Sequence, residues 1–382
     1  MRNYSILFII SSLRRGGAEN HLFNLCTYLR SRSHRPSVCT LSPREDGLER
    51  IFLQHEIPLF RFPLSSLKNL ASPGKLATLR RIVKRTAPDI VHSHLYHADV
   101  IAALASFFTG GCVVTTKHSA GLEFEGKRRW MLRLIRSRFE SVIAVSEQAA
   151  GEALSAGYHP DIVKIIRNGV DTRRYRPAEA AKRPGLRNEF MRRVFTDAPS
   201  DPTLLIGSVG GLKSVKNYSL FMRIASRLIA ESAGDGLDLR FVIIGEGAER
   251  GRLTELAAEL GITGRFAMPG YCDHTEEIYP LFDLFVLPSL SEGVPMVILE
   301  AMSSAVPCVA SDVGDVGRTI GDTGEVVRSG NEEGFVEALR NLLEDSEKRI
   351  ELGRRARVRI MERYDIDAWG ERMVGVYRDI TG

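Results

Sequence analysis

Short apolar segments alternate with helix-length amphipathic segments along this 382-residue chain, and no other feature restricts its fold as strongly. In the first half, strands are predicted at Ile6–Ser11, Ser37–Leu41, Ile90–His92, Cys112–Thr116, Ser141–Val145 and Lys164–Ile166. Apolar residues recur every three or four positions in Ala18–Arg30, Pro73–Thr86, Ala98–Phe108 and Gln148–Ala156. Strands that alternate with helices predict βαβ units around a parallel sheet.

The second half repeats this plan, and the chain is too long for one ordinary core, so two α/β domains are expected. Its strands are predicted at Leu204–Val209, Arg240–Ile244, Arg265–Met268, Leu284–Leu287, Pro307–Ala310 and Glu325–Val327. Its helices are predicted at Tyr218–Ala230, Ala248–Glu259, Met296–Ser303 and Phe335–Glu344. Pro and charged residues punctuate Pro177–Pro202, which predicts a linker. The predicted parts are domains at 1–175 and 203–365, a linker region at 176–202 and a C-terminal helix at 366–382.

The C-terminal helix carries Trp369, Met373 and Tyr377 at four-residue spacing, which predicts one apolar stripe. This stripe could pack on the second domain or cross back to the first, and the sequence leaves both open.

Composition predicts a cytoplasmic protein. No uninterrupted apolar run approaches the roughly 18 residues that a membrane-spanning helix needs. The apolar start of the chain is short and is followed by Arg14 and Arg15, which indicates a buried first strand rather than a signal peptide. The five cysteines form no close pair and are expected to be reduced.

Charge is divided unevenly between the two halves. Residues 1–175 contain 26 Lys and Arg against 14 Asp and Glu, whereas the rest contains 26 against 33. The first half is therefore expected to face something anionic. Within it, Lys127–Phe139 combines arginines with an apolar face of Trp130, Met131, Leu134 and Ile135. This pattern fits either an ordinary surface helix or a peripheral helix on the anionic inner face of a membrane.

The segment Pro288–Pro307 is the most informative for chemistry, because a predicted strand leads through a loop into a predicted helix. The start of a helix offers backbone N–H groups and a partial positive charge to an anion. Gly293 permits close approach of a ligand, and the ionised carboxylates of Glu292 and Glu300 suit sugar hydroxyl groups. Spacing alone slightly favours the alternative of one capping and one exposed glutamate.

The sequence SEGVPMVILEAM (291–302) resembles the two-glutamate signature of the retaining GT-B glycosyltransferases of family 4, also called group 1. Further segments follow the order of that family: GGAEN (16–20), VHSHLYHAD (91–99), TTKHS (115–119), VIAVSE (142–147), NGVD (168–171), IGSVGGLKSVKN (206–217), IIGEG (243–247) and MPGY (268–271). The resemblance extends from about residue 4 to the C-terminal helix. Each motif is weak alone, but their joint order is specific.

The resemblance implies a role for each matching residue. Glu300 would hold the nucleotide ribose, and Glu292 with the backbone of Gly293, Val294, Pro295 and Met296 would hold the transferred sugar. Lys216 would face the donor diphosphate. Gly16 and Gly17 would form an opposing loop near the phosphates, Gly245 would border the donor pocket, and His118 would lie near the transferred sugar and the acceptor. The catalytic residues implied are therefore His118, Glu292 and Lys216.

The family pattern places an arginine where this chain has Gly211, so one expected phosphate-binding cation is missing. Lys213, Arg14 or Arg15 could replace it. The resemblance also implies two Rossmann-like domains facing each other across a cleft, with the donor on the second domain and the acceptor on the first. No cofactor and no metal ion are expected.

Two other motifs leave alternatives open. His92, His94 and His97 follow a strand, and they could be structural, line the acceptor site or bind a metal, of which the metal is least favoured. Gly245, Gly247 and Gly251 are similar to a dinucleotide fingerprint, but the third glycine comes one residue late. These glycines more plainly predict a turn between strand and helix.

The function predicted is a retaining transfer of a sugar from a nucleotide-sugar, with UDP as the favoured nucleotide, to a glycan or lipid-linked acceptor. The nearest alternative is a nucleotide-sugar epimerase with the same two-domain architecture, which would need no acceptor. An NAD-dependent oxidoreductase fits less well because of the irregular glycine spacing. A nucleic-acid-binding module is not expected, because no array of stacking aromatic residues accompanies the basic charge.

Overall fold

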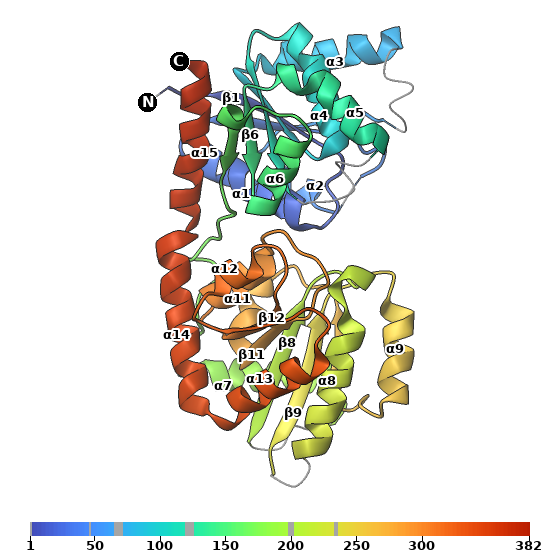
Figure 1. The fold of residues 1–382 in the computed structure, drawn as a ribbon, viewed down its shortest axis with the longest axis vertical. Helices are drawn as coiled ribbons and strands as arrows, with labels where there is room; N and C mark the ends of the chain where they lie inside the picture. Colours follow the sequence, from blue (N-terminus) through green and yellow to red (C-terminus); the bar gives the residue numbers. More distant parts are fainter. Residues whose placement is uncertain (1, 46, 65–71, 119–125, 198–201, 233–235) are drawn as a thin grey trace. The chain divides into compact units, whose positions relative to one another are not determined.

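The computed structural model describes residues 2–45, 47–64, 72–118, 126–197, 202–232 and 236–382. The chain forms two compact units: unit 1 is Met1–Gly169 with Ile366–Gly382, and unit 2 is Val170–Asp365. Each unit is a parallel β-sheet with helices on both faces (Figure 1). The predicted pair of Rossmann-like α/β domains is therefore confirmed.

Within the described residues, the sheet of unit 1 has the order β3-β2-β1-β4-β5-β6-β7. Its strands are β1 (Ser5–Ile10), β2 (Arg35–Thr40), β3 (Leu59–Arg61), β4 (Ile90–His94), β5 (Cys112–Lys117), β6 (Ser141–Ala144) and β7 (Val163–Ile165). Sequence analysis missed β3, which is a three-residue edge strand that is only half-buried and so lacks a strong apolar pattern. The order reverses between β1 and β4, where the carboxyl ends of the strands create a crevice for ligands.

Two apolar cores cover the two faces of this sheet. Along β1, Ile6, Phe8 and Ile10 pack in one core, whereas Leu7 and Ile9 pack in the other, so the whole strand is buried. The helices that surround the sheet are α1 (Gly17–Ser31), α2 (Glu49–Gln54), α3 (Pro73–Thr86), α4 (Tyr96–Ala105), α5 (Gly126–Ile135), α6 (Glu147–Ser155) and α15 (Ile366–Thr381). Helices α1 and α15 lie on one face and α3 to α5 on the other (Figure 1).

The C-terminal helix α15 belongs to unit 1, which settles the alternative that the sequence left open. Its stripe of Trp369, Met373 and Tyr377 is fully buried in the core that contains Ile6 and Leu22. The Tyr28 hydroxyl on α1 donates to Glu371 Oε1 at 2.8 Å at the edge of the same contact.

Unit 2 repeats the topology of unit 1 with the strand order β10-β9-β8-β11-β12-β13 in its described residues. The strands are β8 (Thr203–Val209), β9 (Asp238–Ile244), β10 (Phe266–Gly270), β11 (Leu284–Leu287), β12 (Cys308–Ser311) and β13 (Glu325–Val327). All six predicted strands of this half are present. The order reverses between β8 and β11, so the loops after these two strands are the expected place for a ligand.

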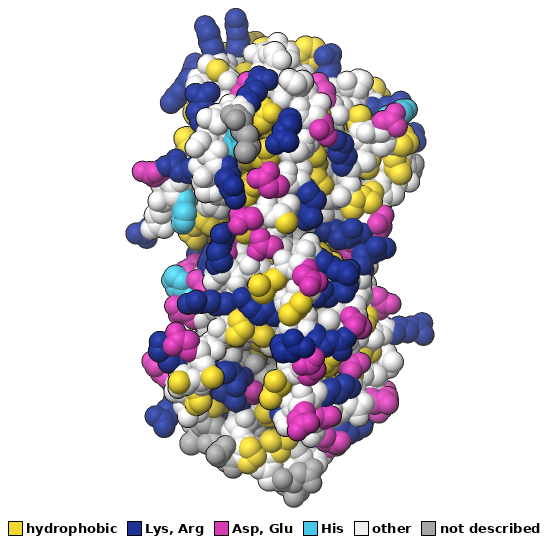
Figure 2. All heavy atoms as spheres, turned by 90° about the vertical axis from the view of Figure 1, so that its left-hand side faces the viewer, with side chains coloured by type: hydrophobic (Ala, Val, Ile, Leu, Met, Phe, Trp, Pro, Cys, Tyr) yellow, Lys and Arg dark blue, Asp and Glu magenta, His cyan; other side chains and the backbone are white. Residues whose placement is uncertain are grey.

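The described helices of unit 2 include four that the sequence pattern did not predict, namely α7, α10, α12 and α14. The full set is α7 (Arg183–Val194), α8 (Tyr218–Glu231), α9 (Arg250–Glu259), α10 (Thr275–Ile278), α11 (Met296–Ser303), α12 (Val316–Ile320), α13 (Glu332–Glu344) and α14 (Ser346–Arg363). Helix α7 lies inside the predicted linker, and its Phe190 and Met191 pack in the unit 2 core. The exposed face of α14 carries interspersed charges of both signs (Figure 2), including the ion pair Arg354–Glu351, and Arg355 pairs with Asp322 just after α12.

Candidate functional site

The candidate donor site lies at the carboxyl ends of β8 and β11 in unit 2. Strand β11 ends at Leu287, and the loop of Pro288–Pro295 leads into α11. Strand β8 leads through a short 3₁₀ turn that ends at Lys216. The two loops are joined because the Leu290 N–H donates to the Val215 carbonyl oxygen at 2.8 Å.

Lys216 and Glu292 form an ion pair at the centre of this site. Lys216 Nζ lies 2.6 Å from Glu292 Oε1, and the Ser289 hydroxyl donates to the same oxygen at 2.6 Å. Both charged side chains are mostly buried, at 18% and 12% exposure, which strengthens their attraction relative to a pair in open solvent. The structure therefore brings together two of the three residues that were predicted to be catalytic.

Glycines allow the turns after β8 and β9 to pack backbone against backbone. A Cβ atom at Gly245 would clash with the Gly210 carbonyl oxygen, and one at Gly247 would clash with the Leu212 carbonyl oxygen. The Leu212 N–H donates to the Glu246 carbonyl oxygen at 2.9 Å. Turn packing therefore explains Gly245 and Gly247, as the sequence favoured, whereas Gly251 has open space where a side chain would lie. The contacts of Gly245 and Gly247 also position the turn that carries Lys216.

The loop before α11 presents its backbone to the same end of the sheet. Pro295 precedes the first helical residue, Met296, so the N–H groups of the first turn have no acceptor within the helix. Gly314 supports the loop, because a side chain there would clash with the Glu292 carbonyl oxygen. The Asp315 N–H also donates to the Gly293 carbonyl oxygen at 3.1 Å. This arrangement can accept an anionic oxygen at the helix start.

Glu300 is buried on α11 and accepts a hydrogen bond from the Tyr279 hydroxyl at 2.7 Å. Burial raises the pKa of Glu300 to about 6, although the Tyr279 hydroxyl and the nearby Arg174 oppose this rise. Burying this carboxylate lowers the free energy of unfolding, and groups with such shifted pKa values are typical of ligand sites. Glu292 and Glu300 have separate partners.

Gly211 stands where the family pattern has an arginine, and the structure shows what lies beside it. A Cβ atom at Gly211 would be 3.6 Å from Lys213 Cε and 3.7 Å from the Glu246 carbonyl oxygen, which are ordinary contact distances. The aliphatic part of Lys213 therefore passes through the space next to the missing side chain. Lys213 forms no ion pair with any residue that the structure describes.

The other predicted site residues, Gly16, Gly17 and His118, belong to unit 1. Gly16 caps α1 directly after the loop from β1, and Gly17 has open space where a side chain would lie. His118 follows the last residue of β5. All three occupy the carboxyl edge of the unit 1 sheet, where ligands of parallel sheets collect.

Four histidine rings are stacked or edge-packed at this edge of unit 1. His94 Nδ1 lies 2.8 Å from His118 Nε2, and His92 contacts the Tyr377 hydroxyl at 2.7 Å and the Thr116 hydroxyl at 2.8 Å. Burial lowers the pKa of His92 to about 3 and that of His21 to about 4. His92 is thus a structural residue that ties β4 to β5 and α15.

A second buried polar network lies next to the histidines. Asp99 on α4 accepts hydrogen bonds from the Ser93 and Thr115 hydroxyls at 2.7 and 2.6 Å, and it pairs with Lys117. Asp99 and Lys117 are fully buried. These contacts connect α4 to β4 and β5. Removal of either charged partner would be strongly destabilising, because it would leave a buried charge unpaired.

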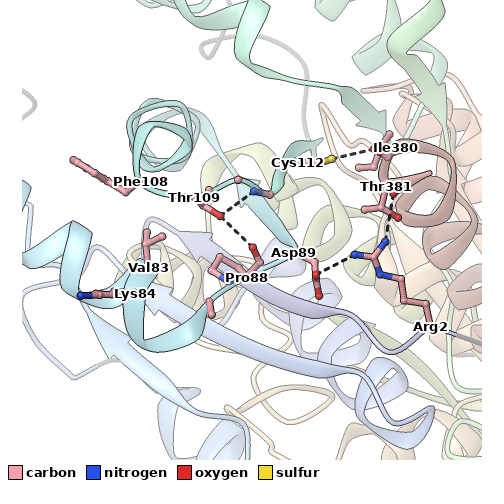
Figure 3. Close-up of a pocket in the computed structure, with 13 residues that line it drawn as sticks. Arg2, Val83, Lys84, Pro88, Asp89, Phe108, Thr109, Cys112, Ile380 and Thr381 are labelled. Carbon is pink, nitrogen blue, oxygen red and sulfur yellow. Dashed lines mark hydrogen bonds and ion pairs between the residues drawn. The ribbon is translucent and has the colours of Figure 1, made fainter.

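An open pocket of about 520 Å³ lies at the opposite edge of the unit 1 sheet (Figure 3). Its walls include Asp89 and Cys112, which stand at the amino ends of β4 and β5. The Cys112 thiol lies 3.0 Å from the Ile380 carbonyl oxygen, and Arg2 pairs with Asp89 at 3.3 Å. Arg2 also donates to the Thr381 carbonyl oxygen at 3.4 Å, so Arg2 and Cys112 both contact the end of α15.

Sequence reasoning missed three residues of these sites. Tyr279 and Ser289 hold the two glutamates, and His21 joins the histidine cluster. Tyr279 and His21 approach their partners only through tertiary packing, so no sequence spacing could indicate them. Ser289 lies three residues before Glu292 in the same loop, and this proximity could have suggested it.

Each unit of the chain matches a model of a known protein family. Residues 15–174 match the family model described as Glycosyltransferase Family 4, and residues 203–345 match the model described as Glycosyl transferases group 1. The chain is 27% identical over 320 residues to the putative glycosyltransferase EpsF of Bacillus subtilis (strain 168). The aligned region covers 80% of this chain and 79% of that protein.

Two further proteins are similar over nearly the whole chain. The Escherichia coli UDP-Gal:alpha-D-GlcNAc-diphosphoundecaprenol alpha-1,3-galactosyltransferase is 26% identical over 364 residues, or 90% of this chain and 88% of that protein. The crystal structure of Anabaena HepE in complex with UDP-glucose has a TM-score of 0.84 at 21% identity, covering 98% of this chain and 99% of that one. This structural likeness supports the two-domain GT-B fold.

The match of both halves to family models agrees with the paired α/β units. The comparisons give no support to an epimerase. The chain belongs to the group 1 glycosyltransferases of the GT-B fold and is a glycosyltransferase enzyme.

Proposed function

We propose that this enzyme transfers a sugar with retention of anomeric configuration from a UDP-sugar to a lipid-linked glycan. The buried Lys216–Glu292 pair at the strand-order reversal of unit 2 carries this proposal. A nucleoside diphosphate gains negative charge as the glycosidic bond breaks, and a fixed cation beside it lowers the barrier. Lys216 would stabilise that charge, while Glu292 would accept hydrogen bonds from hydroxyl groups of the sugar.

The other residues would divide the remaining tasks. Glu300 would bind the ribose hydroxyls, and the backbone of the loop before α11 would bind the transferred sugar. Lys213 would supply the cation that the family has at the position of Gly211, because its stem lies next to that position. Gly16 and Gly17 would approach the phosphates, and His118 would lie near the reacting sugar. No side-chain nucleophile is proposed, because attack on the same face as the departing phosphate gives retention without one.

The choice of UDP and of a lipid-linked acceptor is supported by the similar proteins. The HepE structure contains UDP-glucose, and the Escherichia coli relative is named for UDP-Gal and a diphosphoundecaprenol-linked acceptor. A thermal-shift screen with UDP-, GDP- and ADP-sugars tests the donor. Transfer of the bound sugar to a polyprenyl-diphosphate-linked sugar, with the product anomer assigned by NMR, tests the acceptor and retention. Tight binding of a GDP- or ADP-sugar in place of UDP-sugars would contradict the proposal.

A peripheral position on an anionic membrane is a second part of the proposal. Among the described residues, no helix is long and apolar enough to cross a bilayer. Helix α5 is anchored by Leu132, which is fully buried, while Met131 and Ile135 are partly buried. Trp130 and Leu134 are 61% and 56% exposed. The predicted apolar face is thus divided between the core and the solvent, and its solvent-facing part would insert between lipid headgroups.

Unit 1 has another exposed aromatic residue that could contact a membrane. Phe107 is 62% exposed, and the Arg138 guanidinium lies 4.1 Å from the centre of its ring. Co-sedimentation with vesicles containing anionic lipid should therefore be lost in the double variant Trp130→Ser, Leu134→Ser. The matched control is Ile350→Ser, which removes an exposed apolar residue on α14 of unit 2. Equal binding of all three proteins would rule out α5 as the membrane contact.

A further inference from the structure

Three histidines from different elements converge at the carboxyl edge of the unit 1 sheet. His21 lies on α1, His94 is the last residue of β4, and His118 directly follows β5. One ligand nitrogen from each lies within 4.8 Å of the other two. His21 and His94 are buried, whereas His118 is only partly buried, so the cluster can be reached from one side.

The proton on His21 can be placed from its partner. His21 Nδ1 lies 2.9 Å from Asn168 Oδ1, and a carbonyl oxygen only accepts hydrogen bonds, so Nδ1 carries the proton. His21 Nε2 therefore holds a lone pair. That atom is buried and has no hydrogen-bond partner among the residues that the structure describes. A ring N–H that donates to a carbonyl oxygen while the other nitrogen stays open is the usual arrangement of a metal-binding histidine.

The hydrogen-bonding capacity of the His94 and His118 rings is also only partly used. His94 Nδ1 and His118 Nε2 are 2.8 Å apart, so one donates and the other accepts. The second nitrogen of His94, Nε2, is buried and without a partner in the described part of the chain. Unsatisfied buried nitrogens are rare in proteins, and two of them in one cluster call for a ligand.

We propose that His21, His94 and His118 bind one divalent transition-metal ion, with zinc as the preferred ion, and leave a fourth coordination position open. Imidazole nitrogen suits zinc and its neighbours in the first transition row, and three histidines with one open position are a known zinc arrangement. Zinc–nitrogen bonds of about 2.0–2.1 Å require the ligand nitrogens to lie about 3.3 Å apart, so shifts on the order of 1 Å would complete the site.

The surroundings of the cluster fit this assignment. His92 stacks on His94 with ring centres 4.7 Å apart, and Trp369 packs edge-on against His21 at 4.9 Å. These contacts hold two of the three ligand rings in place. The cluster itself contains no carboxylate, so a bound ion would keep its double positive charge and attract an oxygen ligand to the open position. The inference rests on unit 1 alone and does not depend on the proposed donor site of unit 2.

Cobalt(II) is the spectroscopic probe for the site. Full-length protein without an affinity tag, stripped of metal by a chelator, is titrated with Co²⁺ and then with Zn²⁺. We expect one equivalent of Co²⁺ to produce the visible absorption of a four-coordinate ion, and Zn²⁺ to abolish it. Absence of this absorption, together with no Zn²⁺ binding by calorimetry, would overturn the proposal.

Variants identify the ligands. His21→Gln and His118→Gln should each abolish the Co²⁺ absorption, whereas His159→Ala and His274→Ala, at two exposed histidines, should leave it unchanged. Asn168→Ala should weaken zinc binding by about 10- to 100-fold, because it removes the acceptor that orients His21. Circular dichroism of each metal-free variant checks its folding. Because His118 is partly exposed, His118→Gln remains informative if His21→Gln does not fold. Full metal binding by folded His118→Gln would exclude the three-histidine site.

Discussion

At the scale of single residues, the candidate donor site holds two opposite charges in mostly buried positions. Lys216 and Glu292 come from different strand ends, yet the fold places their charged atoms 2.6 Å apart. Their motifs indicated that both bind the donor, but their mutual contact was not predicted. A donor with a diphosphate would compete with Glu292 for the Lys216 ammonium, so this ion pair is expected to open when the donor binds.

Replacement of Lys216 by alanine tests the role of this cation. We expect Lys216→Ala to lower turnover about 10²- to 10³-fold, which corresponds to roughly 2.7–4 kcal/mol of lost transition-state stabilisation. The measurement is acceptor-dependent release of nucleotide at saturating donor. Lys348→Ala, which removes an exposed lysine of α14, serves as the control and should keep normal turnover. Unchanged turnover in Lys216→Ala would contradict the assigned role.

Glu300 predicts a pH dependence of stability. Because its pKa rises from 4.5 to about 6 on folding, the folded state binds more protons than the unfolded state between these values. Stability should therefore fall as pH rises from about 4.5 to 6, by roughly 2 kcal/mol for this one group. We expect Glu300→Gln to lose this decline and to be more stable than the parent protein above pH 7.

Urea unfolding at several pH values between 4.5 and 8 measures this effect. Glu255→Gln, at an exposed position on α9, is the control and should follow the parent protein. If Glu300 binds the ribose as proposed, the same Glu300→Gln variant should bind UDP more weakly, because it removes the charge that would accept hydrogen bonds from the ribose hydroxyls. A parallel pH profile for Glu300→Gln and the parent protein would mean that Glu300 is not the group responsible.

At the scale of elements, the sequence predicted the apolar stripe of α15 but not the domain against which it packs. The spacing of Trp369, Met373 and Tyr377 predicted one apolar stripe, and the structure buries it against the core of unit 1. Gly169 makes this contact possible, since a side chain there would clash with the Trp369 ring. Helix α15 also bounds the histidine cluster through Trp369 and through the Tyr377 hydroxyl.

Trp369→Ala should destabilise unit 1 by about 3–5 kcal/mol, because it removes a large aromatic side chain that is 1% exposed. The control is Met361→Ala on α14, where the side chain is 51% exposed and the change should stay within about 0.5 kcal/mol. Urea denaturation followed by fluorescence and circular dichroism measures both. A loss below 1 kcal/mol for Trp369→Ala would show that α15 contributes little to unit 1.

At the scale of the whole molecule, the chain passes from unit 1 to unit 2 after Gly169 and returns after Asp365. Each unit has its own sheet and its own apolar cores on both faces of that sheet. Multidomain proteins commonly unfold in more than one step. The predicted donor residues Lys216, Glu292 and Glu300 all lie in unit 2.

Calorimetry should therefore resolve two unfolding transitions. We expect UDP to raise the midpoint temperature of the unit 2 transition only. UDP at 100 times its dissociation constant should add about 2.7 kcal/mol to the stability of the unit that binds it. Trp369→Ala should shift the other transition and so identifies unit 1. A single transition that responds equally to UDP and to Trp369→Ala would contradict independent unfolding.

The sequence by itself determined the parallel α/β architecture, because strands buried on both faces leave continuous apolar runs and helices leave a three- to four-residue period. It also indicated Lys216, Glu292 and Glu300 as candidate donor-binding residues, because the loops that carry them are contiguous segments with recognisable motifs. It missed β3 and α7, where short length or a high content of charged residues weakens the pattern.

Only the tertiary structure decided which distant residues meet. Tyr279, the partner of Glu300, and Asn168, the partner of His21, come from elements distant in the sequence. The tertiary structure also decided that α15 packs on unit 1. The physical reason is that periodicity records whether a side chain is buried, whereas its partner is set by strand order and helix packing across the sheet. The histidine cluster of α1, β4 and β5 is therefore visible only in the folded chain.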